Sequence, residues 1–479
     1  MKKMLSAMSI GLSVLFGSNA VIASAETVNE TSNRNYEKSV AIDYANIVTV
    51  GTKKTSEFRD MATAEIVDEM GIGINLGNTM EATGDWVAQW GDGTPNAYET
   101  CWGSPTITKE MIQGYADEGF RSLRIPVAWS NMMEADGTYT INPAYAARVK
   151  EIVDWSLDTG MYVIINIHWD GGWLEELPTN HDEVMKRFCT MWTQIADLFK
   201  DYNDYLIFEC QNEELGWESI WNQWGGTEDQ KRISYGYVNE VNQAFVDVIR
   251  CSGGNNDKRH LLISGYNTDI EKTCDPLFQM PSDPANRMAI SVHYYTPADF
   301  CIISEDADWA KARATWGTEE DFSTLNRLMD MMKTNYVDKG IPVIIGEFGV
   351  TFENKEYESI KLWLTSVAEA ALKRDMCPVL WDTTGGIYNR ETCKIDYPDI
   401  HDAFTALSDT YAPKKEETKI RGDVNADGQF NISDVVMLQK WLICTPDVTL
   451  TDWKAGDLCE DDGIDVFDLC IMKYELLRK

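Results

Sequence analysis

Basic residues are scarce in this chain of 479 residues. It has 42 Lys and Arg against 77 Asp and Glu, which gives a formal net charge of −35 at pH 7. Nucleic acids and anionic membranes are bound through basic patches, so this balance argues against both kinds of partner. A neutral polysaccharide or a divalent cation suits the chain better, and much of the negative charge serves to keep the surface soluble.

Long apolar runs are absent beyond the N-terminus, so we expect no membrane span. At the start, Lys2 and Lys3 precede a mostly apolar run that the small residues Ala23–Ala25 follow. This pattern is typical of a secretory signal peptide. We expect residues 1–25 to be that peptide, residues 26–55 to be a polar N-terminal tail, and the protein to be secreted.

Several catalytic motifs are missing. The chain has no His-Glu-x-x-His, no Gly-x-Ser-x-Gly and no paired Cys-x-x-Cys, which excludes the usual metalloprotease, α/β-hydrolase and zinc-site patterns. Its 11 cysteines are odd in number and scattered, unlike a compact disulfide framework. Export would permit disulfides. Because Cys210 and Cys377 lie inside apolar runs, we predict buried free thiols instead.

Short β-rich runs alternate with longer amphipathic ones over residues 56–408. The strand-like runs are almost continuously apolar, as in a parallel sheet that is buried on both faces. Eight such units predict an α/β fold, a (β/α)8 TIM barrel with loop insertions. A doubly wound open sheet is the alternative. The expected strands are residues 71–76, 122–127, 162–167, 205–209, 261–265, 289–294, 342–346 and 378–381, and the expected helices include residues 109–118, 144–157, 184–199, 234–249, 324–336 and 357–372.

Gly71 and Gly73 superficially suggest a dinucleotide-binding loop. The third glycine position is Leu76, and the segment itself reads as a strand, so we discard that interpretation.

The C-terminal part of the chain contains an internal duplication. After a polar linker over residues 409–420, the segments Gly422–Asp434 and Gly456–Asp468 resemble each other, and an apolar helix is expected after each, over residues 435–443 and 469–477. Residues 421–479 therefore form a second, small all-α domain.

Polar side chains stand at the ends of the eight predicted strands. Barrel enzymes build their active sites at this end. Two carboxylates flanking one site suit glycoside cleavage, because one protonates the leaving oxygen while the other attacks the anomeric carbon. Glu213 and Glu347 follow the fourth and seventh strands, where a separation of about 5–5.5 Å, as in retaining enzymes, is possible. The whole set is Asn75, Asn78, Arg124, His168, Asn212, Glu213, His293, Tyr295, Glu347 and Trp381.

Residues 70–385 resemble a family 5 glycoside hydrolase, most closely the subfamily of endoglucanases, xyloglucanases and lichenases. The similarity is specific because eight short motifs occur in the family's order and spacing. They are GINLGNTMEA (73–82), ETCWGSPTIT (99–108), LRIPVAW (123–129), INIHWD (165–170), FECQNE (208–213), SVHYYTP (291–297), IIGEFG (344–349) and LWDT (380–383).

The resemblance implies roles for nine of the ten residues at the strand ends. Glu213 would be the acid/base and Glu347 the nucleophile. Asn212 would bind the substrate 2-hydroxyl, and Arg124 and Tyr295 would hydrogen-bond Glu347 and keep it ionised. The remaining expected substrate-binding residues are Asn78, His168 and His293, which line the subsite, and Trp381, which stacks under the sugar.

The sequence departs from the family at two places. Trp169 stands where the family often has a second histidine, and Glu214 stands where a proline often follows the acid/base. Glu214 either places a like charge beside Glu213 or faces solvent. Residues 216–226 carry Trp217, Trp221 and Trp224, which either stack on further sugar units or pack on a neighbouring helix.

The duplicated segments have the spacing of calcium loops. Oxygen donors alternate around a hard cation, and a glycine allows the sharp turn. The first loop is regular. The second has Cys459, a poor calcium donor, at position 3 and Asp462 at the glycine position, so we expect weaker binding there. The expected ligands are Asp423, Asn425, Asp427, Gln429 and Asp434 in the first loop and Asp457, Asp461 and Asp468 in the second.

This module resembles a type I dockerin, which binds a cohesin on a cellulosome scaffold. The resemblance implies cohesin contacts at Ile432-Ser433 and Val466-Phe467, whose unlike chemistry suggests that the two halves are not interchangeable. Calcium is then a structural ion of the dockerin, and catalysis needs no cofactor.

The sequence thus predicts a secreted, cellulosome-associated, retaining endo-β-1,4-glucanase with a monomeric catalytic domain. Its substrate would be a plant cell-wall β-glucan: cellulose, xyloglucan or mixed-linkage glucan. The alternatives are an endo-β-mannanase of the same fold and a non-catalytic polysaccharide-binding barrel.

Overall fold

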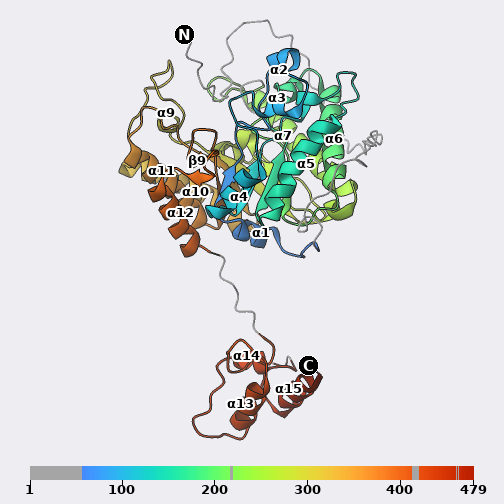
Figure 1. Cartoon of the computed structure of the whole chain (residues 1–479), viewed down its shortest axis with the longest axis vertical. Coiled ribbons are helices and arrows are strands. Elements are labelled where there is room, and N and C mark those ends of the chain that lie inside the picture. The colour runs from blue at the N-terminus through green and yellow to red at the C-terminus, as the bar shows by residue number, and fades with distance from the viewer. Residues whose placement is uncertain (1–56, 216–219, 413–419, 460, 462, 479) are drawn as a thin grey trace. The chain divides into compact units, whose positions relative to one another are not determined.

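The computed structural model describes residues 57–215, 220–412, 420–459, 461 and 463–478. The predicted signal peptide, the predicted tail and most of the predicted linker lie outside these residues. The chain divides into two compact units, Met1–Ala412 and Pro413–Lys479 (Figure 1).

The first unit is built on a closed barrel of eight parallel strands in the order β1 to β8. This confirms the (β/α)8 prediction and excludes the open sheet. Each predicted strand is present, and β7 continues two residues beyond its predicted end at Gly346. The strands are β1 (Gly73–Asn75), β2 (Ser122–Ile125), β3 (Tyr162–Asn166), β4 (Leu206–Glu209), β5 (Leu261–Ser264), β6 (Met288–Tyr294), β7 (Val343–Phe348) and β8 (Met376–Leu380).

Amphipathic helices surround the barrel, and the six predicted ones are present. Helix α7 starts six residues earlier than expected because Thr227 and Gln230 form a capping box. The helices of this unit are α1 (Thr63–Met70), α2 (Asp85–Trp90), α3 (Pro95–Glu99), α4 (Lys109–Asp117), α5 (Pro143–Asp158), α6 (His181–Phe199), α7 (Glu228–Cys251), α8 (Ile270–Thr273), α9 (Ala298–Cys301), α10 (Glu319–Asn335), α11 (Tyr357–Leu372) and α12 (Pro398–Thr410).

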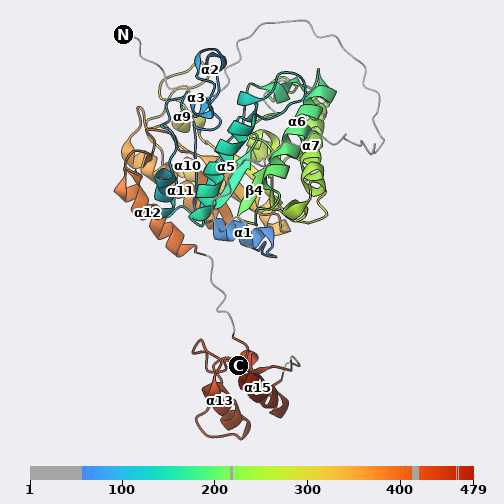
Figure 2. The same ribbon diagram turned by 45° about the vertical axis from the view of Figure 1, so that its right-hand side comes forward.

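The two ends of the barrel are covered differently. Helix α1 packs Ile66, Val67 and Met70 against inward-facing strand residues such as Ile164 and Ile344, which closes the N-terminal end. Helices α2 and α3 lie at the opposite end in both views, where the strands terminate (Figure 1, Figure 2). This leaves the strand C-termini as the place for a site. The short strands β9 (Tyr388–Asn389) and β10 (Lys394–Ile395) pair outside the barrel.

Helix α12 ends at Thr410, so residues 409–410, predicted as linker, belong to a helix. In the second unit, α13 (Ile432–Leu442) and α15 (Val466–Arg478) follow the two duplicated loops, and α14 (Trp453–Gly456) precedes the second loop. Apolar residues such as Val424, Leu438, Leu469 and Met472 form its own small core.

The eleven cysteines all lie within the described residues and form no disulfide, and Cys210 and Cys377 are buried, as predicted. Burial raises the pKa of the Cys377 thiol to about 12, so this thiol stays protonated. None of the helices in the described part of the chain is both long and apolar enough to cross a membrane.

Candidate active site

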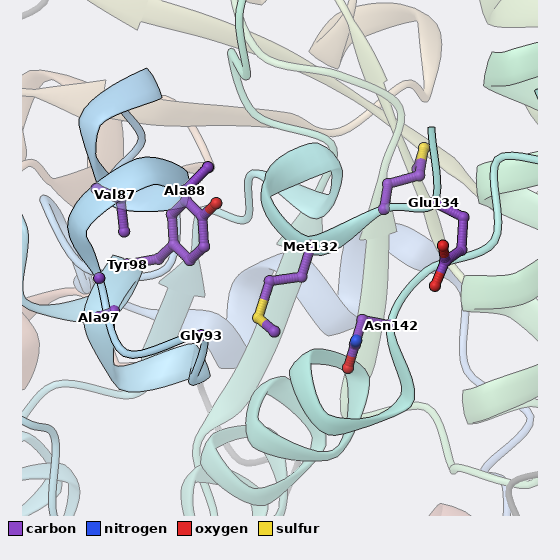
Figure 3. A pocket seen from close by; sticks show the side chains of 10 residues that line it. Val87, Ala88, Gly93, Ala97, Tyr98, Met132, Glu134 and Asn142 are labelled. Atoms are coloured by element: carbon purple, nitrogen blue, oxygen red, sulfur yellow. The ribbon is translucent and has the colours of Figure 1, made fainter. Parts of the chain in front are cut away.

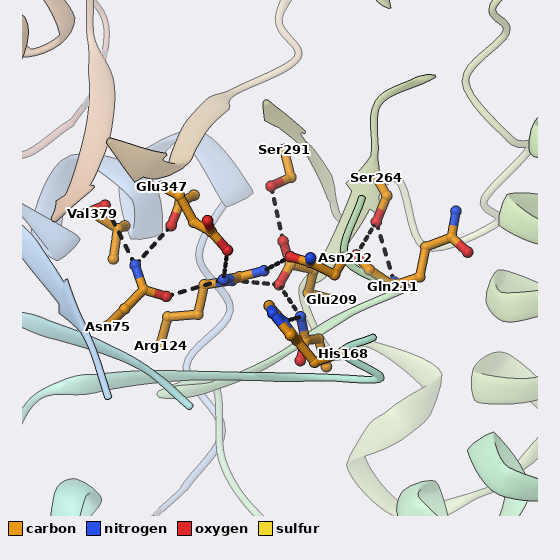
Figure 4. A network of polar contacts seen from close by, with 12 residues as sticks. Asn75, Arg124, His168, Glu209, Gln211, Asn212, Ser264, Ser291, Glu347 and Val379 are labelled. Carbon is orange, nitrogen blue, oxygen red and sulfur yellow. Dashed lines mark hydrogen bonds and ion pairs between the residues drawn. The ribbon is translucent and has the colours of Figure 1, made fainter. Parts of the chain in front are cut away.

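Arg124 lies at the centre of a polar network where the strands end (Figure 4). Its side chain is completely buried. Burial alone would lower its pKa, but the carboxylates of Glu209 and Glu347 raise it, so the guanidinium stays charged. Its Nε donates to Glu209 Oε2 at 2.6 Å, its Nη1 to Asn75 Oδ1 at 3.0 Å and Glu347 Oε1 at 2.7 Å, and its Nη2 to Asn212 Oδ1 at 3.0 Å.

Glu209 is a member of this network that the sequence reasoning missed. It is fully buried and also accepts hydrogen bonds from Ser291 Oγ at 2.8 Å and Asn166 Nδ2 at 3.1 Å. A buried cation needs a charged and hydrogen-bonded partner. Glu209 therefore balances the positive charge of Arg124. In the sequence, the feature that could have identified Glu209 was a carboxylate at the end of an otherwise apolar strand.

A bulge in β7 places Glu347. The pairing of β6 with β7 runs from Val292 opposite Ile345 to His293 opposite Glu347, so Gly346 is an extra residue. A Cβ at Gly346 would lie 2.8 Å from Ser291 Oγ and 3.1 Å from His293 Nε2. A residue larger than glycine would have to displace these side chains, and the bulge turns Glu347 toward Arg124.

Glu347 is 5% exposed and is held at both oxygens. Oε1 accepts from Arg124, and Oε2 accepts from the Tyr295 hydroxyl at 2.9 Å. Burial raises the pKa of this carboxyl. His293, Arg124 and the Tyr295 hydrogen bond act in the opposite direction and favour the ionised form.

Glu213 lies beside Glu347 with His293 between them. His293 Nδ1 lies 2.7 Å from Glu213 Oε1 and 3.6 Å from Glu347 Oε2. One oxygen of each carboxyl lies within 4.8 Å of the other. The side chain of Glu213 is one-third exposed while that of Glu347 is nearly covered, so the two carboxyls occupy different environments.

His168 and Trp381 form a wall of the site. Their rings stack with centroids 6.1 Å apart and an interplanar angle of 10°. Burial, followed by the nearby Arg124 and His293, lowers the pKa of His168 well below its usual value, so this imidazole is neutral. Trp169, the first departure from the family, is partly exposed beside it.

Asn78 lies in the loop after β1, which is firmly held. The Glu81 carboxylate accepts from the backbone N–H groups of Asn78 and Thr79, and Ser104 Oγ donates to the Asn78 carbonyl at 2.6 Å. Arg390 donates to the Gly77 carbonyl at 2.7 Å. Burial raises the pKa of Glu81 to about 7. The sequence reasoning did not identify this supporting group.

Glu214, the second departure, is buried, so the expectation that it could face solvent is wrong. It is 5% exposed, and neither carboxyl oxygen has a hydrogen-bond partner among the described residues. Burial, with further contributions from Asp170 and Glu213, raises its pKa well above the usual value. This shift favours the protonated, neutral form of the carboxyl that follows Glu213 in the chain.

The tryptophans of residues 216–226 differ in how far they are buried. Trp221 packs on Tyr235 and Tyr266, with ring centroids 6.2 and 6.1 Å away, so it is structural. Trp224 is 78% exposed. Trp217 lies outside the described residues.

The first predicted calcium loop is organised by its own carboxylates. Asp423 accepts from the N–H groups of Asp427 and Gly428 at 3.1 and 2.9 Å, and Asp434 accepts from Asn431 at 2.9 Å. Burial raises the pKa of Asp434, and Asp423 and Asp427 raise it further. The loop thus brings negative charges together, and a bound cation would reduce their mutual repulsion. Gln429 donates its backbone N–H to Asp427 Oδ1 at 3.0 Å.

The second loop folds in a similar way but offers fewer oxygen donors for calcium. Asp457 accepts from the Asp461 N–H at 3.2 Å, and Asp468 accepts from Leu458 and Cys459 at 2.8 and 3.0 Å. Asp462 lies outside the described residues. At the helix starts, Ile432, Val466 and Phe467 are 62%, 56% and 67% exposed.

Comparison with known proteins gives matches in both units. The model of the family Cellulase (glycosyl hydrolase family 5) matches residues 80–385, and that of the Dockerin type I domain matches residues 421–477. The chain is similar to Endoglucanase B of Clostridium cellulovorans, with 34% identity over 83% of this chain and 87% of that protein.

Two further similarities concern substrate range. A xyloglucan-specific endo-beta-1,4-glucanase of Bacteroides ovatus is 35% identical over 70% of this chain and 68% of its own length. The solved structure of a GH5-4 broad specificity endoglucanase from an uncultured bovine rumen ciliate is 36% identical, with a TM-score of 0.66 over 73% of this chain and 99% of that one.

Proposed function

The chain belongs to glycosyl hydrolase family 5, is an endo-glucanase and carries a type I dockerin domain, and from this premise we propose that it is a retaining enzyme with Glu213 as acid/base and Glu347 as nucleophile. One observation carries the proposal: an oxygen of each carboxyl lies within 4.8 Å of the other. Retaining glycosidases have their carboxyls about 5–5.5 Å apart, whereas inverting ones need about 6.5–9.5 Å to admit a water.

The reaction proceeds in two displacements. Glu347 attacks the anomeric carbon while Glu213 gives its proton to the glycosidic oxygen, so the C–O bond breaks and the leaving chain departs with a new hydroxyl. Glu213, now ionised, takes a proton from water, whose oxygen attacks the anomeric carbon and releases Glu347. Configuration at that carbon is inverted twice and so retained.

The surrounding groups suit these roles. Arg124 and Tyr295 donate to both oxygens of Glu347, and these contacts favour the ionised form that a nucleophile requires. Asn212 accepts from Arg124 through its carbonyl oxygen, which leaves its amide group to donate to the sugar 2-hydroxyl. His168 and Trp381 present stacked rings as a wall for a pyranose ring.

We infer that the substrate is the β-1,4-glucan class of the plant cell wall, cleaved internally. The names of similar proteins include an endoglucanase, a xyloglucan-specific enzyme and a broad-specificity endoglucanase. The family match and the endoglucanase relatives argue against a non-catalytic barrel. An activity panel across cellulose, mixed-linkage glucan, xyloglucan and mannan identifies the preferred polymer.

We infer that the dockerin domain binds calcium and a cohesin, and that the protein works outside the cell on a cellulosome. The loop donors fit a hard cation, because Asp423, Asp427 and Asp434 crowd like charges that raise the pKa of Asp434 beyond the effect of burial. Asn425 and Gln429 would complete the first site, and Asp457, Asp461 and Asp468 would hold the second ion. The exposed Ile432, Val466 and Phe467 suit a protein partner.

The stereochemistry tests the mechanism. NMR of the first products from a soluble β-glucan should show β-anomers, because the starting bond is β and configuration is retained; α-anomers would refute the assignment of the carboxyl pair. Glu347→Gln should lower kcat roughly 10³-fold or more, as removal of a nucleophile does. Exposed Glu353 in the loop after β7 offers the matched control, and Glu353→Gln should keep wild-type turnover.

A further inference from the structure

The exposed tryptophans of the barrel unit gather at one end. Each lies in the connection that leaves the C-terminal end of a strand, which is the end that carries the site. Exposed tryptophan on a soluble protein usually marks a binding surface. Among the described residues of this unit, they are Trp86 (53% exposed), Trp90 (82%), Trp169 (40%), Trp224 (78%) and Trp309 (58%).

Two of these tryptophans share one short helix. Trp86 and Trp90 are four residues apart on α2, so they lie on the same side of it. Val87 is 6% exposed and anchors the helix on the unit. A Cβ at Gly84 would lie 2.3 Å from two atoms of the Trp86 ring, so the indole rests against the Gly84 backbone. The ring is thus placed by packing although more than half of it is exposed.

A pocket of about 300 Å³ adjoins this helix (Figure 3). Val87 and Ala88 of α2 and Tyr98 of α3 form one side, and Met132 faces them from the loop after β2. Glu134 and Asn142 add polar groups. An apolar surface with a few hydrogen-bonding groups suits a sugar ring, which has apolar faces and a polar edge.

The local charge disfavours an anionic ligand. Residues 83–108, which contain α2 and α3, include no Lys or Arg, while Asp85 begins α2, Asp92 follows it and Glu134 lines the pocket. A neutral polyhydroxylated chain meets no electrostatic penalty here, whereas a phosphate, a nucleic acid or an acidic polysaccharide would be repelled.

We propose that Trp86, Trp90 and the adjoining pocket form an accessory binding shelf for the glycone end of a neutral β-glucan chain. The inference rests on the proposed function, because the occupant is the substrate polymer beyond the cleaved bond. Glu213 protonates the leaving oxygen, so the leaving part of the chain lies on the side of β4. The other part extends toward Trp381 after β8 and Asn78 after β1, and the α2 loop continues from β1.

The test uses the full-length chain and the double variant Trp86→Ala/Trp90→Ala. KM for soluble mixed-linkage β-glucan should rise roughly tenfold, the loss expected when two ordinary ring-stacking contacts are removed. Turnover of an aryl cellobioside, which spans only the cleaved bond and two sugar units, should be unchanged. Gly84→Ala keeps both indoles but displaces Trp86, and it should raise the polymer KM in part.

Trp453→Ala, which removes a 41% exposed tryptophan from the dockerin unit, is the matched control and should change neither substrate. Binding is also read by retardation in a gel containing β-glucan, with Glu347→Gln as the background. Unchanged KM and retardation in the double variant would overturn the shelf. Absence of hydrolysis by the wild type would refute the proposed function instead, and the retardation would still report on the shelf.

Discussion

At the scale of single residues, Glu214 is the most unusual group. Its carboxyl is buried and has no hydrogen-bond partner among the described residues, and burial raises its pKa well above the value of an unfolded chain. The folded protein therefore binds a proton that the unfolded protein releases near pH 4.5. The stabilising effect of this proton is complete below that pH and is lost as the pH rises toward the folded-state pKa.

Glu214→Gln should remove this dependence. The stability of the variant relative to wild type should grow with pH above about 4.5, by at most about 1.4 kcal/mol per pH unit. Thermal unfolding between pH 5 and 9 measures it. Glu228→Gln, at an exposed position of α7, should run parallel to wild type. A difference between Glu214→Gln and wild type that does not change with pH would show that Glu214 is ionised in the folded protein.

At the scale of the element, the bulge in β7 sets the direction of the proposed nucleophile. Gly346→Ala would press a methyl group on Ser291 Oγ and His293 Nε2, which lie 2.8 and 3.1 Å from the Cβ position. We expect kcat to fall roughly 10²-fold, as for a misplacement of about 1 Å, and stability to fall by about 1–3 kcal/mol.

Gly236→Ala is the control, because a Cβ at this helical position meets no atom within 4 Å. It should keep full activity and gain about 0.5–1 kcal/mol of stability. Steady-state kinetics and denaturant unfolding measure both variants. Normal kcat in Gly346→Ala would mean that the bulge can relax without moving Glu347.

At the scale of the whole molecule, the two units should respond separately to calcium. The proposed catalytic residues all lie in Met1–Ala412, and the proposed calcium ligands all lie in Pro413–Lys479. Chelation with EDTA should abolish cohesin capture and leave the hydrolysis of soluble β-glucan intact. Activity lost with EDTA would place a required metal in the barrel.

Calorimetric titration of the calcium-free chain should then show two unequal sites. The first loop has an uninterrupted set of oxygen donors, whereas Cys459 replaces one in the second. Asp423→Ala should remove the tighter site and Asp457→Ala the weaker one. Two equal, tight sites would show that the thiol position does not weaken the second loop.

The sequence by itself determined the architecture. Apolar runs that end in polar residues specify buried parallel strands and place Asn75, Arg124, Asn212 and Glu347 at one end, because all the strands of a barrel run the same way. Loop spacing specified the second unit in the same local way. These patterns depend only on neighbours along the chain. Strand and helix ends shifted by a few residues where local capping, as at Thr227, extended an element.

Only the tertiary structure decided which polar and aromatic groups are buried. Glu209 pairs with Arg124 across 85 positions of sequence, and Glu214 is covered rather than solvated. Trp221 packs on Tyr235 while Trp86 and Trp90 remain exposed. These outcomes depend on residues brought together from distant strands and loops. A side chain's burial and charge state follow from those contacts, which no local pattern of residues contains.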